Sequence, residues 1–220
     1  MTGGHAEFLS SGRLDDLQCV YSGVKAICLA KPSKAAAVCA VLDNEEVGST
    51  TKHGAASTFL KDVLARINGS FGYGAEDQIR FLSQSFMVSA DNVHAMHPNF
   101  PEKSDTGNHL VLNEGVVIKY SANQKYTTDA VTGALFKVLC EHAKVPVQVF
   151  VNRSDMLGGS TLGNISNTQV SIPTVDIGAP QLAMHSAYET CGARDTVYLV
   201  KAARELFSSH LELTGEGIRI

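Results

Sequence analysis

Strand-like and helix-like apolar patterns alternate along the whole chain, and this alternation limits the folds that it can adopt. Continuous apolar runs and two-residue alternation predict strands at residues 35–43, 84–91, 114–121, 146–155 and 172–180. Apolar residues at helical spacing predict helices at residues 14–30, 53–67, 128–144 and 193–213. Strands that alternate with helices predict an α/β fold: a three-layer sandwich around a mostly parallel central sheet.

Turn and capping signals set the ends of several of these segments. The turn pair Asn68-Gly69 ends the second predicted helix. Gly158 and Gly159 precede a further helix start, which Ser160 is expected to cap. Asp195 is predicted to be the N-cap of the closing helix.

Composition narrows the function classes. Of the 220 residues, 44% are hydrophobic, and no linker or repeat divides them, so residues 1–220 are predicted to form one domain. A net charge of −4 without a Lys/Arg cluster argues against a nucleic-acid partner. No apolar run approaches the roughly 20 residues that span a bilayer, and the start lacks a secretory signal, so no membrane partner is expected. Five scattered cysteines without a C-x-x-C pair favour the reducing cytoplasm.

Acidic residues gather where predicted strands end. The stretch "VLDNEEVGST" (residues 41–50) places Asp43, Glu45 and Glu46 directly after the first predicted strand. Carboxylates this close repel each other, and the pKa of at least one must rise unless a cation lies among them. In open α/β sheets, ligands bind beyond the carboxyl ends of the strands, so we expect a cation there.

Other metal-competent side chains follow at further element ends: Asp15, Asp91 and His185. One carboxylate at a strand end usually caps the next helix, so each residue alone favours a structural role. Several at the same edge of a sheet favour a pair of divalent ions bridged by a carboxylate, a geometry that activates water and polarises a carbonyl. Zn²⁺, Mn²⁺ and Co²⁺ all suit such ligands, and the residues do not choose among them.

Six sequence blocks together resemble one known family, the aspartyl aminopeptidases. They occur in order along nearly the whole chain as "SGRLDDL", "LDNEEVGS", "SADNVHAMHPNF", "VIKYSANQKY", "DMLGGSTLG" and "VDIGAPQLAMHS". Members of this family are two-metal exopeptidases that remove N-terminal acidic residues and assemble into hollow tetrahedral dodecamers. The resemblance therefore implies a zinc-dependent hydrolase of peptides with an N-terminal Asp or Glu, and a homo-oligomer.

The resemblance also implies roles for single residues. Asp15 resembles the carboxylate that bridges both metals, Glu46 and His185 resemble ligands of one metal, and Asp91 resembles a ligand of the other. Glu45 resembles the general base, which takes a proton from the attacking water and later delivers it to the leaving amine.

Three more positions match substrate contacts of the family. His94 resembles a residue near the scissile carbonyl, while Lys119 and Tyr126 match further substrate-contacting positions. The alternative for Lys119 is an outward-facing lysine on a strand. Asp43 and Asp176 are expected to be structural.

The chain also departs from the family pattern. A family member is about twice as long, and the resemblance implies that this chain corresponds to the C-terminal portion, without the first catalytic strands and an inserted dimerisation domain. A His-x-Asp motif, whose His is the third protein ligand of the metal held by Asp91, is absent from the 220 residues. We therefore expect one complete metal site (Asp15, Glu46, His185), one incomplete site, and an uncovered sheet edge.

Two functions follow from these observations. One is a metallo-aminopeptidase that needs the missing segment for full activity. The alternative is a non-catalytic remnant that serves as an assembly or interaction module. Intact "NEE", "RLDD" and "AMHS" favour the enzyme, and the missing His-x-Asp favours inactivity of this chain alone.

Overall fold

A computed structural model describes residues 1–156, 158–214 and 217–220 of the chain. The helices are α1 (Leu14–Leu29), α2 (Phe59–Ser70), α3 (Ala75–Ser83), α4 (Ala130–Ala143), α5 (Leu162–Ser166) and α6 (Ala193–Ser208), with a 3-10 turn at Pro101–Lys103. The strands are β1 (Phe8–Ser11), β2 (Met87–Ala90), β3 (Val93–His94), β4 (Val116–Tyr120), β5 (Val147–Val151), β6 (Thr174–Gly178), β7 (Pro180–Leu182), β8 (Glu189–Gly192), β9 (Glu212–Thr214) and β10 (Gly217–Arg219).

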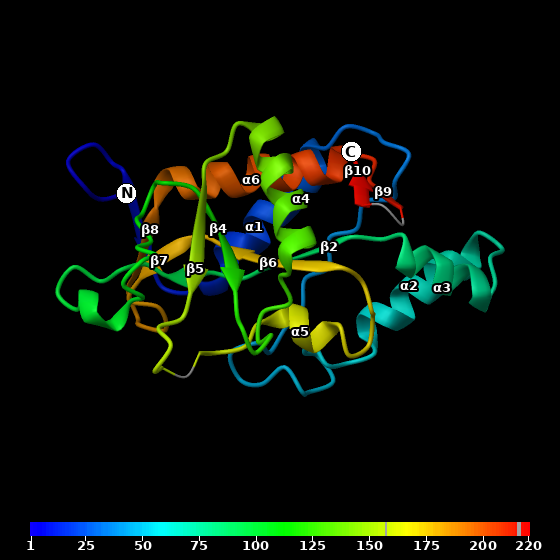
Figure 1. Ribbon diagram of the computed structural model, residues 1–220, viewed down its shortest axis with the longest axis horizontal. Helices are drawn as coiled ribbons and strands as arrows, with labels where there is room; N and C mark the ends of the chain where they lie inside the picture. The colour runs from blue at the N-terminus through cyan, green and yellow to red at the C-terminus, as the bar shows by residue number, and fades with distance from the viewer. Residues whose placement is uncertain (157, 215–216) are drawn as a thin grey trace.

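The central sheet has the strand order β2-β6-β4-β5. Strands β2 and β6 are parallel, as are β4 and β5, whereas β4 and β6 are antiparallel. Two of the three pairings are thus parallel, and α4, α5 and α6 lie beside the sheet, whereas α2 and α3 project away from it (Figure 1). The predicted α/β fold is confirmed, with one antiparallel pairing in its centre.

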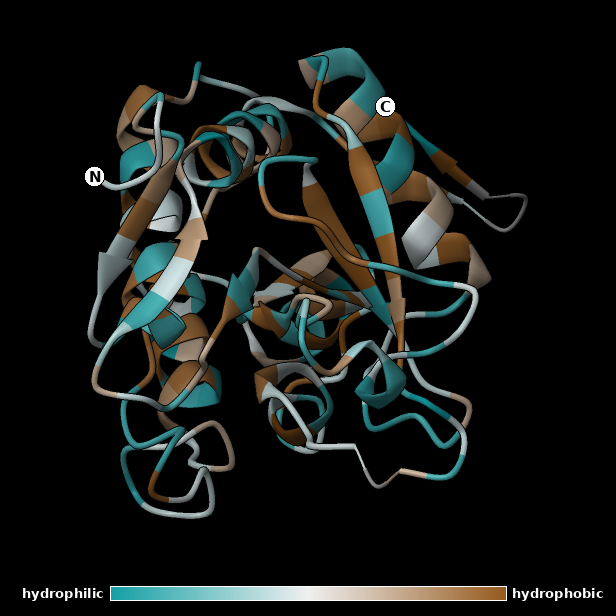
Figure 2. Ribbon diagram, turned by 90° about the vertical axis from the view of Figure 1, so that its left-hand side faces the viewer, coloured by the Kyte–Doolittle hydropathy of each residue, from teal (hydrophilic) through white to brown (hydrophobic). Residues whose placement is uncertain are grey.

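The two faces of this sheet are covered differently. Val116 and Ile118 of β4 and Val175 of β6 face one side, where they pack with α4 and α6 in the main hydrophobic core. Because side chains alternate along a strand, Lys119 and Asp176 face the other side, which α5 covers. Helices therefore cover both faces, although α5 is only one turn long. Much of the length of the strands is hydrophobic (Figure 2).

A second sheet, with the order β1-β8-β7-β3, joins the two ends of the chain. Strand β1 pairs antiparallel with β8, in the register Phe8 opposite Gly192 and Ser11 opposite Glu189. None of the periodic patterns predicts β1 or β8, because their sequences, "FLSS" and "ETCG", belong to no longer apolar stretch. This pairing brings the start of α1 beside the loop between β7 and β8.

Residues 35–43 do not form the predicted strand. They have no regular secondary structure, and Val41 is 49% exposed. A strand needs backbone partners as well as apolar side chains, and β2, the strand at this edge of the sheet, pairs only with β6 among the described residues. Residues 34–47 instead border a cavity of about 1230 Å³ together with α1, β2 and α6.

Both ends of α2 differ from prediction. Residues 53–58 are turns, and α2 begins at Phe59, because the backbone there holds the preceding loop: Asp43 N–H donates to the His53 carbonyl and Ala56 N–H donates to the Ser49 carbonyl. The same helix continues through Asn68-Gly69 to Ser70.

The predicted N-caps of α5 and α6 are also wrong. Thr161, rather than Ser160, is the N-cap of α5. Gly192 is the N-cap of α6, because the Asp195 carboxylate accepts hydrogen bonds from Asn113 and Gly115 instead. Helix α6 ends at Ser208, and a β9–β10 hairpin follows. Within the described part of the chain, no helix has the length and apolar character needed to cross a membrane.

Candidate metal centre

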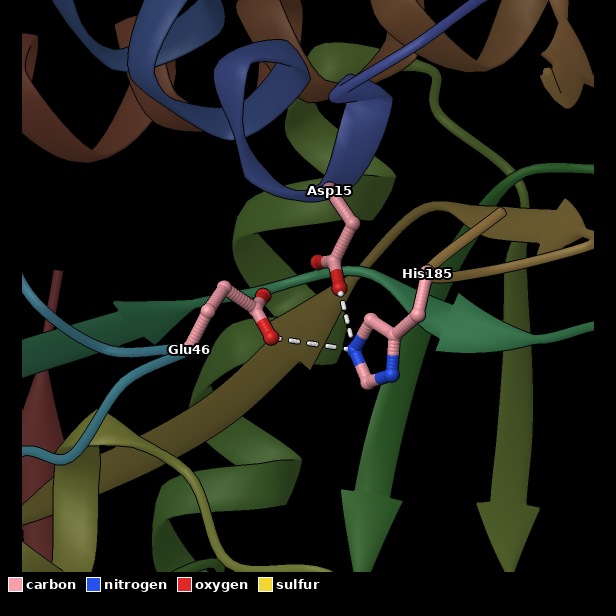
Figure 3. Close-up of side chains that lie close together, drawn as sticks. All are labelled: Asp15, Glu46 and His185. Carbon is pink, nitrogen blue, oxygen red and sulfur yellow. Dashed lines mark ion pairs between the residues drawn. The ribbon is translucent and has the colours of Figure 1, made fainter. Parts of the chain in front are cut away.

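Three potential metal ligands from distant parts of the chain meet at one point. The Nε2 atom of His185 lies 3.2 Å from Oδ2 of Asp15 and 3.1 Å from Oε2 of Glu46 (Figure 3). Asp15 is the second residue of α1, Glu46 lies in the loop before α2, and His185 lies between β7 and β8. The three ligand atoms lie within 4.8 Å of one another. One divalent cation can therefore contact all three side chains.

The centre is closed on one side and open on the other. The side chain of Asp15 is 3% exposed, while those of Glu46 and His185 are 47% and 64% exposed. His185 has a φ of +66°, a backbone conformation that non-glycine residues rarely adopt. A substrate can thus approach from the side of His185.

A second group of carboxylates shares Asp15. Asp15, Asp16 and Asp91 each offer an oxygen within 4.8 Å of the others. Asp16 was not among the predicted ligands, although its place beside Asp15 in "RLDDL" is a signal that could have found it. Buried Asn92 holds this region together, because its Nδ2 donates to the carbonyl of Leu14.

The electrostatics of these carboxylates favour a bound cation. Burial, followed by the negative charges of Asp91 and Glu46, raises the pKa of Asp15 to about 9. Burial and Asp91 also raise the pKa of Asp16 well above its usual value. Among the described residues, Oδ1 of Asp15 and Oδ1 of Asp16 are buried without a hydrogen-bond partner. Buried polar atoms normally have partners, so these two oxygens fit a divalent cation.

Glu45 lies in the same electrostatic environment, although it belongs to neither ligand group. Partial burial, then the charges of Asp91 and Glu46, raises its pKa to about 7, against the opposing effect of Lys119 and His185. A carboxyl group with such a pKa exchanges protons readily near neutral pH.

Lys119 is buried rather than outward-facing, so the alternative of a solvent-facing strand lysine is wrong. Its side chain is 2% exposed, and its Nζ donates to Oδ2 of Asp91 at 3.1 Å and to the carbonyl of Asn92 at 2.8 Å. Burial lowers the pKa of Lys119, but Asp91 and Tyr126 outweigh this effect and raise it overall. The Tyr126 ring centroid lies 5.6 Å from Nζ, so the ring lies beside the ammonium group of Lys119.

His94, at the end of β3, faces the same group of charges and is partly exposed. Partial burial, then the positive charges of His185 and Lys119, lowers its pKa. His5 and His53 belong to neither ligand group found in the part of the chain that the structure describes.

Asp176 connects two loops that border the region of Lys119. It is almost fully buried, and its Oδ2 accepts hydrogen bonds of 2.6 Å from the backbone N–H and the hydroxyl of Thr127. Its Oδ1 accepts a hydrogen bond of 2.7 Å from the hydroxyl of Thr161, at the start of α5. This arrangement agrees with the expected structural role. Leu157, in the block "DMLGGSTLG", lies outside the described residues.

The positions and charges of these side chains suit a divalent cation, and Glu45, with a pKa of about 7, belongs to the same group of charges. The structure brings together the four predicted ligands, Glu45, His94 and Lys119. The ammonium group of Lys119 forms an ion pair with Asp91. Two oxygens and one imidazole nitrogen with room for water are typical of catalytic zinc sites.

Comparisons with known proteins agree with this chemistry. The sequence profile of the family described as "Aminopeptidase I zinc metalloprotease (M18)" matches residues 1–207. A "Probable M18 family aminopeptidase 2" of Clostridium acetobutylicum is 52% identical over 202 residues, which are 92% of this chain and 47% of that protein. The chain spans about half the length of the curated relatives that it matches.

Solved structures show the same fold. A structure of the Ape4 and Nbr1 complex matches with a TM-score of 0.88 and 37% identity, over 94% of this chain and 41% of that chain. The mApe1 dodecamer of S. cerevisiae matches with a TM-score of 0.79 and 30% identity, over 94% of this chain and 47% of that chain.

Proposed function

Because the chain belongs to the aminopeptidase I zinc metalloprotease (M18) family, we propose that it carries the metal centre of an aminopeptidase that removes N-terminal acidic residues from peptides. The observation that carries this proposal is the meeting of Asp15, Glu46 and His185 around one point, with Glu45 beside them. We assign Asp15, Glu46 and His185 to one zinc ion, and Asp15, Asp16 and Asp91 to a second, weaker site.

Each residue near the centre has a role in the proposed reaction. When bound, a divalent ion supplies a Lewis acid that lowers the pKa of a water molecule and polarises the scissile carbonyl. Glu45 accepts the proton that the attacking water gives up and delivers it to the leaving amine, as its pKa of about 7 permits. His94 lies close enough to feel the charge of His185, and we assign it a contact with the substrate near the carbonyl.

The proposed preference for an acidic first residue depends on Lys119, whose ammonium group lies beside the Tyr126 ring. Lys119 is a cation close to the centre, and a substrate carboxylate is a partner that suits its ammonium group. At present Asp91 holds that ammonium group. A divalent cation held by Asp91 would weaken this ion pair and leave more of the charge of Lys119 for a substrate carboxylate.

We further propose that this chain alone binds one zinc ion tightly and cleaves poorly. The first site has three protein ligands and space for water, whereas Asp91 in the second is already neutralised by Lys119. Mn²⁺ and Co²⁺ also suit these ligands, and Mn²⁺ is the weakest binder of the first-row divalent series at a given site.

One experiment tests the metal and the activity together. Zinc content is measured after dialysis, beside an assay of aspartyl-amide and alanyl-amide cleavage. We expect about one zinc ion per chain, slow turnover at most, and any turnover to favour the aspartyl substrate. No bound zinc would refute the metal centre. Two tightly bound ions with fast turnover would refute the weakness of the second site, and equal cleavage of both substrates would refute the acidic preference.

A second candidate function is an assembly module without catalysis. Exposed Val38 and Val41, beside the open edge of β2, favour it, because an uncovered sheet edge invites association. It predicts no aspartyl-amide cleavage under any metal loading, including excess zinc, manganese or cobalt. Cleavage that appears when metal is added favours the enzyme.

We also propose that the protein acts in the cytoplasm as a homo-oligomer. The five cysteines are free thiols, which suits a reducing compartment. The mApe1 protein of S. cerevisiae, similar in fold over 94% of this chain, forms a dodecamer. Light scattering of the purified chain tests the association, and a monomer at all concentrations would contradict it.

A further inference from the structure

One buried carboxylate contacts the backbone of two proposed zinc ligands. Glu189, the first residue of β8, is 2% exposed. Its Oε2 accepts a hydrogen bond of 3.0 Å from the backbone N–H of Asp15, and its Oε1 accepts one of 2.8 Å from the backbone N–H of His185. Each carboxylate oxygen thus holds one ligand residue.

These two hydrogen bonds satisfy both the buried carboxylate of Glu189 and the backbone N–H groups of Asp15 and His185. Among the described residues no ion pair involves Glu189, so a buried carboxylate depends on these N–H groups for its partners. The N–H of Asp15 lies in the first turn of α1, where no intrahelical acceptor is available. His185 has a φ of +66°, and its N–H hydrogen bond supports this uncommon conformation.

The position of Glu189 explains how it reaches both segments. Glu189 pairs with Ser11 in the β1–β8 ladder, and Ser11 lies shortly before Asp15. His185 lies in the loop that leads from β7 into β8. One side chain therefore links segments from opposite ends of the sequence, where a shift of either would separate the Asp15 carboxylate from the His185 ring.

We propose that Glu189 is a positioning residue that sets the distance between Asp15 and His185 for a divalent cation. This inference rests on the proposed zinc centre, and adds that the centre is preformed by a carboxylate that does not touch the ion. Outer residues that orient metal ligands typically change metal affinity by 10–100-fold when replaced.

The test uses Glu189→Gln, which keeps the size of the side chain but replaces one acceptor oxygen with an NH₂ group. That group faces a backbone N–H and cannot accept its hydrogen bond. We expect the zinc affinity of this variant, measured by competition with a chromogenic chelator, to fall about 10–100-fold. We also expect zinc to raise its unfolding midpoint by less than it raises that of the unmodified chain.

Asp195→Asn is the matched control. Asp195 is also buried, and its carboxylate also accepts two backbone hydrogen bonds, from Asn113 at 2.6 Å and Gly115 at 3.1 Å, but neither donor is a proposed zinc ligand. The zinc affinity of Asp195→Asn should stay within about twofold of that of the unmodified chain, because Asp195 contacts no proposed zinc ligand. An equal loss in both variants would overturn the positioning role.

Further measurements decide the remaining outcomes. Glu189→Asp keeps the charge, but its side chain is one methylene too short to reach both N–H groups, so its zinc affinity should also fall. Unchanged affinity in both Glu189 variants, while the unmodified chain binds zinc, overturns this inference alone. No zinc binding by the unmodified chain overturns the proposed function as well. If neither variant folds, slow amide hydrogen exchange at Asp15 and His185 in the zinc-loaded chain supports the inference, and unprotected exchange refutes it.

Discussion

Strand β4 and residues 35–43 have similar apolar sequences but opposite surroundings. Val116, Val117 and Ile118 of β4 are fully buried between β5 and β6. In residues 35–43, Val38 and Val41 are exposed, and this segment pairs with no strand among the described residues. The difference shows that an apolar run becomes a buried strand only where neighbouring strands supply both hydrogen bonds and cover.

The same contrast divides the proposed metal centre. Asp15 and Asp91 belong to or follow elements that pack against the core, and His185 lies in the loop between β7 and β8; Asn92 and Glu189 hold the segments of Asp15 and His185 by hydrogen bonds. Glu45 and Glu46 come from the loosely packed loop that follows residues 35–43. We therefore expect changes in the packed region to alter stability, and changes in the loop to alter chemistry.

The largest expected effect is on turnover, from Glu45→Gln. In a preparation that cleaves an aspartyl amide, turnover should fall about 10²–10⁴-fold, because the variant cannot carry the proton. Zinc content and the unfolding midpoint should not change, since Glu45 is not a proposed ligand and its loop adds little to the core. Glu76→Gln, on the exposed surface of α3, is the control. If the variant instead loses zinc and keeps high turnover, Glu45 is the zinc ligand and Glu46 is the general base.

The next effect is on stability, from Phe136→Ala in the packed region. Phe136 of α4 is fully buried in the main core, so its loss should lower the free energy of unfolding by about 3–5 kcal/mol. Urea denaturation measures this change. Val138→Ala, at a partly exposed position of the same helix, should cost about 0.5 kcal/mol or less. Similar losses in both variants would mean that α4 is not packed as described.

The packed region also predicts a pH dependence through Asp195. Burial raises the pKa of Asp195 to about 6, against the hydrogen bonds from Asn113 and Gly115. The unfolded chain, with a pKa of about 3.9, ionises first, so the contribution of Asp195 to stability is full below about pH 4 and is lost as the pH rises to about 6. The total change is roughly 3 kcal/mol, from about two pKa units.

Comparison with Asp195→Asn isolates this contribution. Urea denaturation of both metal-free chains between pH 4 and pH 8 gives the difference in free energy of unfolding. That difference, unmodified minus variant, should fall up to about pH 6 and then stay constant. A difference that rises with pH would show that the hydrogen bonds outweigh burial.

The smallest expected effect comes from Val41→Ala, in the exposed segment. The free energy of unfolding should change by about 0.5 kcal/mol or less, because Val41 has little cover to lose. Urea denaturation at low protein concentration measures it. A loss above about 2 kcal/mol would show that the side chain is buried in solution, and would remove the contrast with β4.

Much of the fold can be predicted from local patterns. Strands β2, β4, β5 and β6 and helices α1, α4 and α6 lie within predicted segments, because each belongs to a longer stretch with a clear apolar pattern. Strands β1 and β8, with the sequences "FLSS" and "ETCG", belong to no such stretch. Only Pro180 of β7 falls in the predicted segment 172–180, and helix α3 was missed.

The sequence by itself determined the α/β class, because short-range periodicity is a local property, and it identified Asp91 directly after strand β2. It also pointed to Asp15, Glu46 and His185, which the structure brings together. The tertiary structure alone decided that residues 35–43 are exposed, that Lys119 binds Asp91, and that Glu189 holds two ligand segments. Burial and hydrogen bonding depend on neighbours that are distant in sequence, and no local pattern records which neighbours a segment will meet.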